Sequence, residues 1–339
     1  MIVRNVNEAL YRLLLLYQHP TDKVYRELHA RGTCTWELRE MPFITQYMMP
    51  DECVLFSPTR NANPFFHFFE ALHLLAGRDD LKFMTHLLAR YSDFSDDGER
   101  LHGAYGVRIR ECDQLMEAIF EMKRDPDSRR AVVAIWQPEH DAGYRGKDMP
   151  CNCLVDFKLR EGALHMVVHN RSNDAVWGAY GSNVVQFSFL QQYVAMHLDC
   201  KIGTYSQVSD SMHVYPDNEP TKTLLRDADI LKTDAYENGW VKPQPFLSDP
   251  FMTAEDWDAD LSLFFALFDE DKIGSSDLYH TDWWINTAYP MWMAFTHYKA
   301  GDLGQALSSA EMIRSTDWHM AALQWLRRIE LKRDQGTEL

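Results

Sequence analysis

The chain has 339 residues, of which 46% are hydrophobic and 25% are charged, a composition typical of a globular protein with a sizeable core. Its formal net charge of −16 excludes a broad nucleic-acid-binding surface, because an acidic protein repels a polyanion. A local cluster of Arg residues can still hold one phosphate group. We therefore expect no direct nucleic-acid binding.

The six cysteines occur at irregular spacings, which indicates reduced thiols in a cytoplasmic protein rather than a disulfide framework. Cys151 and Cys153 are separated by a single residue, a spacing that suits zinc poorly, so no metal site is expected. No apolar run is long enough to cross a bilayer, and we expect no membrane partner.

The spacing of apolar residues predicts helices and strands up to about residue 215, then an irregular stretch, then helices only. In chain order, we expect a helix over 3–30 interrupted at Pro20, a strand over 33–43, helices over 65–76 and 112–123, a buried strand over 131–136, a hairpin of 153–159 with 164–169, a helix over 184–197, strands within 203–215, and helices within 260–333.

Several short polar motifs follow one another in the middle of the chain. They are Asp125-Pro126-Asp127-Ser128-Arg129-Arg130, Pro150-Cys151, Arg171-Ser172-Asn173-Asp174, Gly178 with Asn183, and His213-Val214-Tyr215. Each is weak alone, but their order and spacing resemble the thymidylate synthase family, which includes the phage deoxycytidylate and deoxyuridylate hydroxymethylases. Upstream, Arg31, Glu70 and Tyr105 extend the resemblance to roughly residues 30–220.

The resemblance implies an α/β fold of the α+β type, in which flanking helices cover a mixed sheet. It also implies a homodimer that forms through the sheet face and shares its active sites between chains. We predict a catalytic domain over 1–220, an irregular connecting segment over 221–259 and a C-terminal helical extension over 260–339.

The resemblance assigns the chemistry to a thiol and a carboxylate. Cys151 is the expected nucleophile, because a thiolate adds to C6 of a pyrimidine and makes C5 nucleophilic. By residue type alone, a buried structural cysteine is the commoner outcome. Glu70 is the expected general acid/base, because a carboxylate on so apolar a helix is costly to bury, although an exposed helix stripe is the alternative.

Two further residues match family positions near the folate. Tyr105 is expected beside the catalytic centre, and Asp174 is expected to hold the pterin of 5,10-methylenetetrahydrofolate, the implied cofactor. An exposed Asp at a helix start is the alternative for Asp174.

The phosphate of a pyrimidine nucleoside monophosphate requires cations, and Arg binds it bidentately. The expected phosphate residues are Arg31, Arg129, Arg130, Arg171 and Ser172. In the family the pair equivalent to Arg129 and Arg130 reaches into the partner's site, while a solvated turn is the alternative for this pair.

The sugar and the base each have candidate partners. His213 and Tyr215 alternate on a predicted strand, which places both on one face for a single sugar hydroxyl, or makes them a half-buried pair at a strand end. Asn183 matches the base-reading Asn of the family. However, the chain has one extra residue after Arg171, and a gapless count puts Ser182 there instead. An amide favours dUMP slightly, and a flipped amide also serves dCMP.

Three departures from the synthase indicate a different product. Asn152 replaces a His after the nucleophile, Ile109 replaces a Trp, and the last residues do not match the tail that closes over the folate. If water reaches the exocyclic methylene before hydride, the product is a 5-hydroxymethyl nucleotide. Such a product suits a phage enzyme acting in the host cytoplasm. A methylating thymidylate synthase and a catalytically inactive nucleotide-binding module remain alternatives.

Overall fold

The computed structural model describes residues 1–18, 24–30, 32–228, 233–247 and 249–335. The chain forms two compact units, which are described separately. The first comprises Met1–Arg60 and Phe69–Asp234, and the second comprises Asn61–Phe68 and Ala235–Leu339.

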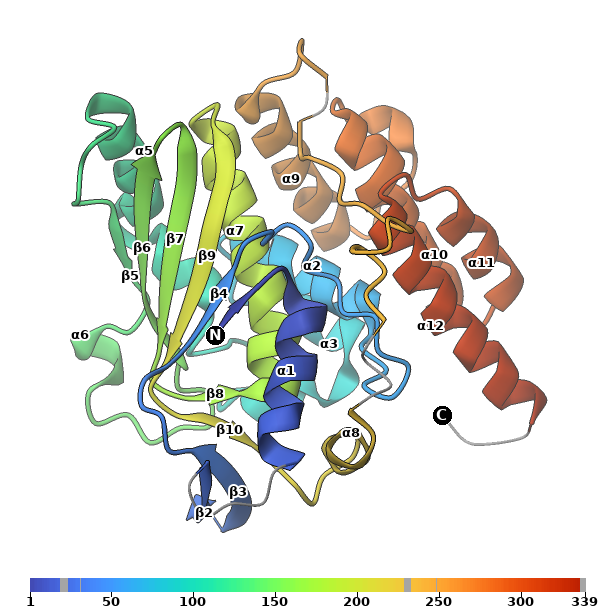
Figure 1. Cartoon of the computed structure of the whole chain (residues 1–339). Helices are drawn as coiled ribbons and strands as arrows, with labels where there is room; N and C mark the ends of the chain where they lie inside the picture. The colour runs from blue at the N-terminus through green and yellow to red at the C-terminus, as the bar shows by residue number, and fades with distance from the viewer. Residues whose placement is uncertain (19–23, 31, 229–232, 248, 336–339) are drawn as a thin grey trace. The chain divides into compact units, whose positions relative to one another are not determined.

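A mixed six-stranded sheet is the centre of the first unit (Figure 1). In spatial order its strands are β1 (Ile2–Val3), β4 (Phe43–Tyr47), β9 (Lys201–Ser209), β7 (Ala163–Asn170), β6 (Asn152–Arg160) and β5 (Val132–Ala134). β7 runs parallel to β9, whereas β6 is antiparallel to both of its neighbours. The sheet is thus mixed, as the sequence predicted.

A smaller four-stranded sheet completes the first unit. Its strands, in spatial order, are β2 (Tyr25–Ala30), β3 (Thr33–Leu38), β10 (Met212–Val214) and β8 (Asn173–Asp174). β10 and β8 are short and parallel, and they bring the segment after β7 beside the segment after β9. This sheet therefore joins two of the motifs that are far apart in the sequence.

Helix α7 (Asn183–His197) is the most buried helix of the first unit, since every residue except Met196 is buried. It packs on β7 and β9, where the Gln191 side-chain amide donates to the Leu164 carbonyl at 2.8 Å. The other helices that begin in this unit or extend into it are α1 (Val6–Gln18), α2 (Pro64–Leu75), α3 (Leu81–Leu87), α4 (Tyr105–Arg110), α5 (Gln114–Arg124), α6 (Pro138–Asp141) and α8 (Thr221–Arg226).

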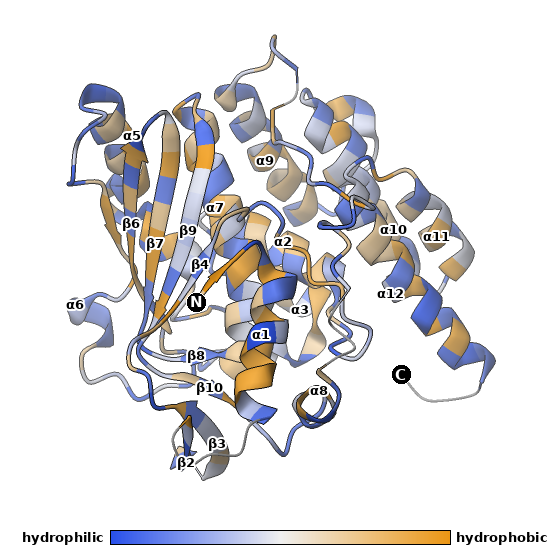
Figure 2. Cartoon of the chain, in the orientation of Figure 1, coloured by the Kyte–Doolittle hydropathy of each residue, from blue (hydrophilic) through white to orange (hydrophobic). Residues whose placement is uncertain are grey.

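Hydrophobic residues recur along α1 and along the strands of the large sheet (Figure 2). Along β7, the buried side chains of Leu164, Met166 and Val168 alternate with partly exposed ones. Such alternation is expected of a sheet with one face in the core. Ile44 on β4 is 43% exposed and Val132 on the edge strand β5 is 41% exposed, so the second face retains apolar surface.

One predicted element and the predicted burial of another are wrong. Residues 25–30 form the strand β2, not the end of a helix, because they pair with β3 along their whole length and Tyr25 stacks on Trp36 at 4.8 Å. The strand predicted over 131–136 is present but shorter, as β5, and its full burial is wrong because it lies at the sheet edge with Val132 41% exposed. The predicted helices at 65–76, 112–123 and 184–197 and the hairpin of β6 and β7 are confirmed.

The second unit contains the helices α9 (Ala254–Asp269), α10 (Tyr289–Lys299), α11 (Leu303–Glu311) and α12 (Thr316–Asp334). Trp257, Trp283 and Trp284 pack together in its core with centroid separations of about 5.5 Å. The buried Asp260 carboxylate accepts hydrogen bonds from the backbone and hydroxyl of Thr281. Among the described helices of the chain, none has the length and hydrophobicity of a membrane span.

Two glycines in helices provide a matched test of packing. We expect Gly106→Ala to destabilise the protein by about 1–3 kcal/mol, because the new Cβ would lie 2.6 Å from the Leu74 carbonyl oxygen of α2. A Cβ at Gly304 would have no neighbouring atom closer than 3.7 Å. The Gly304→Ala protein should therefore be as stable as the original, or more stable by up to about 1 kcal/mol. Urea unfolding of both variants measures this, and equal effects would contradict the close approach of α4 and α2.

Candidate active site

Cys151 lies directly before β6, and the Arg171 side chain fixes the segment that carries it. The Arg171 guanidinium donates from Nε to the Pro150 carbonyl at 2.9 Å and from Nη2 to the Met149 carbonyl at 3.0 Å. The same Nη2 lies 3.8 Å from the Cys151 Sγ. A guanidinium at this distance stabilises the thiolate form, which is the reactive form of a cysteine.

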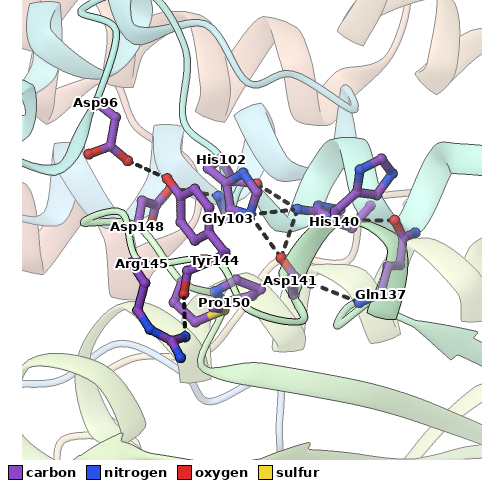
Figure 3. A network of polar contacts seen from close by, with 12 residues as sticks. Asp96, His102, Gly103, Gln137, His140, Asp141, Tyr144, Arg145, Asp148 and Pro150 are labelled. Carbon is purple, nitrogen blue, oxygen red and sulfur yellow. Dashed lines mark hydrogen bonds and ion pairs between the residues drawn. The ribbon is translucent and has the colours of Figure 1, made fainter.

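A buried carboxylate anchors the chain that leads into Cys151 (Figure 3). Asp141 has a fully buried side chain, and its Oδ1 lies 2.9 Å from His102 Nε2 and 3.1 Å from Arg108 Nη2. Its Oδ2 accepts from the Gln137 backbone amide at 2.8 Å. One buried charge thus ties the start of the 137–150 segment to the segment that precedes and includes α4.

The end of the same segment is held in a similar way (Figure 3). The Gly103 amide donates to Asp148 Oδ2 at 2.8 Å, and a Cβ on Gly103 would lie 2.9 Å from the Asp148 carbonyl. Tyr144 stacks on the His102 ring at 3.6 Å and bonds through its hydroxyl to Asp96. The segment before the nucleophile is therefore fastened at both ends.

Tyr105, on α4, lies beside the thiol. Burial is the main reason why the pKa of its hydroxyl is raised, and the negative charge of the Cys151 thiolate adds to the effect. Hydrogen bonding to Asn152 opposes this shift. The structure thus brings the predicted Tyr105 and Cys151 together.

Glu70 is 6% exposed, and its Oε1 accepts a hydrogen bond from the Tyr91 hydroxyl at 3.0 Å. Burial raises the pKa of the Glu70 carboxyl to about 7, and hydrogen bonding to Ser182 and Gln186 opposes this shift. A carboxyl with a pKa near neutrality can take up or release a proton at physiological pH. Glu70 and Ser182, both predicted from the sequence, are thus neighbours.

A chain of side-chain amides connects the residue after the nucleophile to the candidate base-binding residue. Asn152 Nδ2 lies 3.4 Å from Asn183 Oδ1, and Asn183 Nδ2 donates to Asn173 Oδ1 at 3.1 Å. Asn173 continues the chain by donating to Gln207 and Ser209. Neither Asn152 nor Asn173 was predicted to bind substrate, although Asn173 is part of a predicted motif and Asn152 follows the predicted nucleophile.

A π-helical segment, η3 (Ala175–Ser182), connects β8 to α7. Gly181 has φ −120° and ψ −107°, which is not helical, so the chain bulges there. After the bulge, Asn183 begins α7 with a buried side chain, whereas Ser182 is partly exposed and neighbours Glu70.

Asp174 caps η3 by accepting from the Val176 and Trp177 amides at 2.8 and 3.3 Å. Burial raises the pKa of its carboxyl, against the opposing charges of His213 and Arg60. His213 is paired with Asp174 across β10 and β8 and meets Tyr215 edge-to-face at 5.4 Å. The predicted sugar residues therefore lie next to the predicted pterin residue.

Two cations beside one aromatic ring were not predicted. The buried Arg60 guanidinium lies 4.1 Å over the Trp177 ring, and that of Arg90 lies 5.6 Å from it. Arg60 also donates to the Val176 carbonyl at 2.8 Å, and burial lowers the pKa of its guanidinium to about 10. The sequence offers no signal for Arg60, which lies in a polar stretch without a motif.

The predicted phosphate residues are only partly assembled. Arg171 and Ser172 adjoin the nucleophile segment, whereas Arg129 and Arg130 are exposed in the turn before β5. Over the described ranges, neither Arg129 nor Arg130 forms a hydrogen bond or ion pair with Cys151 or Arg171. Arg31 lies outside the described residues.

Residues 6–230 match the family model of thymidylate synthase. A deoxyuridylate hydroxymethyltransferase of Pseudomonas phage M6 is 36% identical, over 96% of this chain and 93% of its own length. Another from Bacillus phage SP01 is 38% identical, over 61% of this chain and 58% of its own length. A putative thymidylate synthase of Methanothermobacter thermautotrophicus is 36% identical over 39% of this chain and 60% of its own length.

The burial of Glu70 makes stability depend on pH. The pKa of its carboxyl rises from 4.5 to about 7 on folding, so the protonated form is favoured in the folded protein. The stability of the protein relative to the Glu70→Gln variant is therefore highest below pH 4.5 and falls as the pH rises through about 7. The loss should reach about 3 kcal/mol at most, since one pKa unit corresponds to about 1.4 kcal/mol.

Urea unfolding of both proteins between pH 4 and pH 9 measures this difference. Glu117→Gln, at an exposed position of α5, is the control for a carboxylate in contact with water. A difference between protein and Glu70→Gln variant that does not change with pH would contradict the burial of an ionisable carboxyl.

Proposed function

Because the chain belongs to the thymidylate synthase family, we propose that it transfers a one-carbon unit to C5 of a pyrimidine deoxynucleoside monophosphate and that water completes a 5-hydroxymethyl group. The observation that carries this proposal is the contact between the Cys151 thiol and the Arg171 guanidinium, in the same unit as a buried carboxyl at Glu70. The full-length similarity to a phage deoxyuridylate hydroxymethyltransferase supports the hydroxymethyl product.

Cys151 begins the reaction by adding its sulfur to C6 of the base. The pair of electrons from the C5=C6 bond then makes C5 nucleophilic. Arg171 favours the thiolate and, with Ser172, binds the nucleotide phosphate, so that substrate and nucleophile are aligned by the same side chain. We assign Arg31, Arg129 and Arg130 to the same phosphate.

His213 and Tyr215 bind the sugar hydroxyl, and Asn183 reads the base. The amide chain through Asn152 and Asn173 supports Asn183 in this role, because it fixes the orientation of the carboxamide. An amide that accepts from N3–H and donates to O4 selects uracil, so we favour dUMP over dCMP. The similarity to phage deoxyuridylate hydroxymethyltransferases supports this choice.

The residues around Trp177 fit a folate. An aromatic ring with two guanidinium groups suits a flat ring system that ends in carboxylates, and Asp174 offers a carboxylate to a pterin. When bound, 5,10-methylenetetrahydrofolate supplies the one-carbon unit. Asp174, Trp177 and Arg60 would hold it, with Tyr105 beside the reacting carbon.

Glu70 handles the protons of the later steps. Its pKa of about 7 allows it to release a proton to the base and to accept one from water. The similarity to two phage deoxyuridylate hydroxymethyltransferases supports hydration of the exocyclic methylene rather than hydride transfer.

A homodimer completes the proposed site. Arg129 and Arg130 are exposed in one chain, and the second sheet face retains apolar residues such as Ile44 and Val132. Pairing through this face would carry the two arginines to the partner's phosphate. The net charge of −16 favours a free nucleotide over nucleic acid as substrate, and we place the reaction in the cytoplasm of a phage host.

Mass spectrometry tests the function directly. The protein is incubated with methylenetetrahydrofolate and either dUMP or dCMP, and we expect the dUMP tube to gain one CH₂O unit. Cys151→Ser should abolish the product, whereas Cys200→Ser, at the turn before β9, should leave it unchanged. A gain of CH₂ together with dihydrofolate would establish a thymidylate synthase instead, and bound but unchanged nucleotide would establish an inactive binding module.

The assignment of Asn183 predicts a change in base preference. Asn183→Asp should lower kcat/KM for dUMP and raise it for dCMP, because a carboxylate accepts a hydrogen bond from the cytosine amino group but repels O4. Two good hydrogen bonds to a base are worth about 1–3 kcal/mol, which corresponds to a change of about 5–150-fold. Ser182→Ala is the control, and a loss of base selectivity in this variant rather than in Asn183→Asp would move the base-reading role to Ser182.

A further inference from the structure

We propose that Tyr91 is a positioning residue for Glu70: its hydroxyl holds the carboxylate in one orientation, as the acceptor of the proton that water releases during hydroxymethylation. The kinetic part of this inference rests on the proposed function. The structural part is a hydrogen bond from the hydroxyl of Tyr91, in an exposed segment, to the buried Glu70 carboxylate. It does not depend on the proposed function.

The geometry of the pair is direct. Tyr91 Oη donates to Glu70 Oε1 at 3.0 Å, and the other carboxylate oxygen, Oε2, is fully buried. A charged hydrogen bond to a buried carboxylate is stronger than one in water, because the surroundings screen it less. Tyr91 thus holds one of the two oxygens in place.

Tyr91 reaches Glu70 from an exposed segment. It belongs to the 3-10 helix η1 (Ala89–Phe94), whose Ser92 and Asp93 are exposed. Its ring packs on that of Phe94 at 5.4 Å, and Phe94 is itself 49% exposed. Tyr91 thus links an exposed segment to a buried carboxylate.

The groups around the pair of Tyr91 and Glu70 differ in charge. Ser182 and Gln186, from η3 and α7, are hydrogen-bonding neighbours of Glu70 and are neutral. On its own helix, His73 contacts Asp80 at 3.3 Å. Tyr91 itself faces Asp148 and Tyr105 as well as Glu70, and with burial these raise the pKa of its hydroxyl, so Tyr91 stays protonated and acts as a donor.

The proton balance of the step needs such a donor. The water oxygen bonds to the exocyclic methylene carbon, the π electrons of the methylene move onto the C4 oxygen, and one water proton passes to Glu70. Departure of the Cys151 thiolate then restores the C5=C6 bond, and Glu70 returns its proton to solvent. A hydrogen bond that stabilises the ionised carboxylate keeps Glu70 able to accept that proton.

Tyr91→Phe keeps the ring and removes only the hydroxyl. We expect the acidic limb of the kcat profile to move upward by about one pH unit, which is about a tenfold loss at pH 6 and little loss at pH 8.5. KM for dUMP should stay within about twofold, and in a Glu70→Gln background Tyr91→Phe should have no further effect. An equal loss of kcat at every pH would overturn the proposal.

A second measurement needs no activity. The pH at which the protein loses stability relative to Glu70→Gln should rise by about one unit when both carry Tyr91→Phe. An unchanged midpoint would overturn the proposal even in an active enzyme. If no product forms but the midpoint rises, the bond between Tyr91 and Glu70 stands and the proposed function fails.

Discussion

The position of the nucleophile depends on one guanidinium group. Arg171 donates hydrogen bonds to the carbonyls of the two residues before Cys151. Its Nη2, which bonds to the Met149 carbonyl, also lies 3.8 Å from the Cys151 sulfur. A charged donor bonded to two carbonyls resists displacement, because its loss would leave two polar groups unsatisfied. The Arg171 guanidinium therefore determines both the backbone geometry of residues 149–151 and the electrostatic environment of the Cys151 thiol. A change in the position of Arg171 would alter both.

The remainder of the site is arranged around this point by buried polar groups rather than by apolar packing alone. Asp141 ties the segment before Cys151 to the segment that leads into α4, and the amide chain from Asn152 to Asn173 ties the start of β6 to the start of α7. Buried hydrogen bonds of this kind favour one arrangement of side chains, because a buried polar group that loses its partner is costly.

The sequence predicted the parts of the fold that have strong local periodicity. Helices α2, α5 and α7 and the hairpin of β6 and β7 were recognisable, and the family inferred from ordered motifs is confirmed by the match over residues 6–230. β2 was missed because its polar residues carry no periodic signal and its pairing with β3 is what makes it a strand. Arg60 and Tyr91 were missed for a related reason: their partners, Trp177 and Glu70, are distant in sequence.

The bulge at Gly181 has a consequence for the geometry of α7. An α-helix turns by about 100° per residue. If α7 began one residue earlier or later in the sequence at the same point in space, each of its side chains would therefore point about 100° away from its present direction. Because α7 is buried on all sides, such a rotation would exchange the residues that face the sheet for those that face the nucleophile. The non-helical backbone at Gly181 therefore helps to set the residue at which α7 begins, and with it the side chains that α7 presents to the sheet.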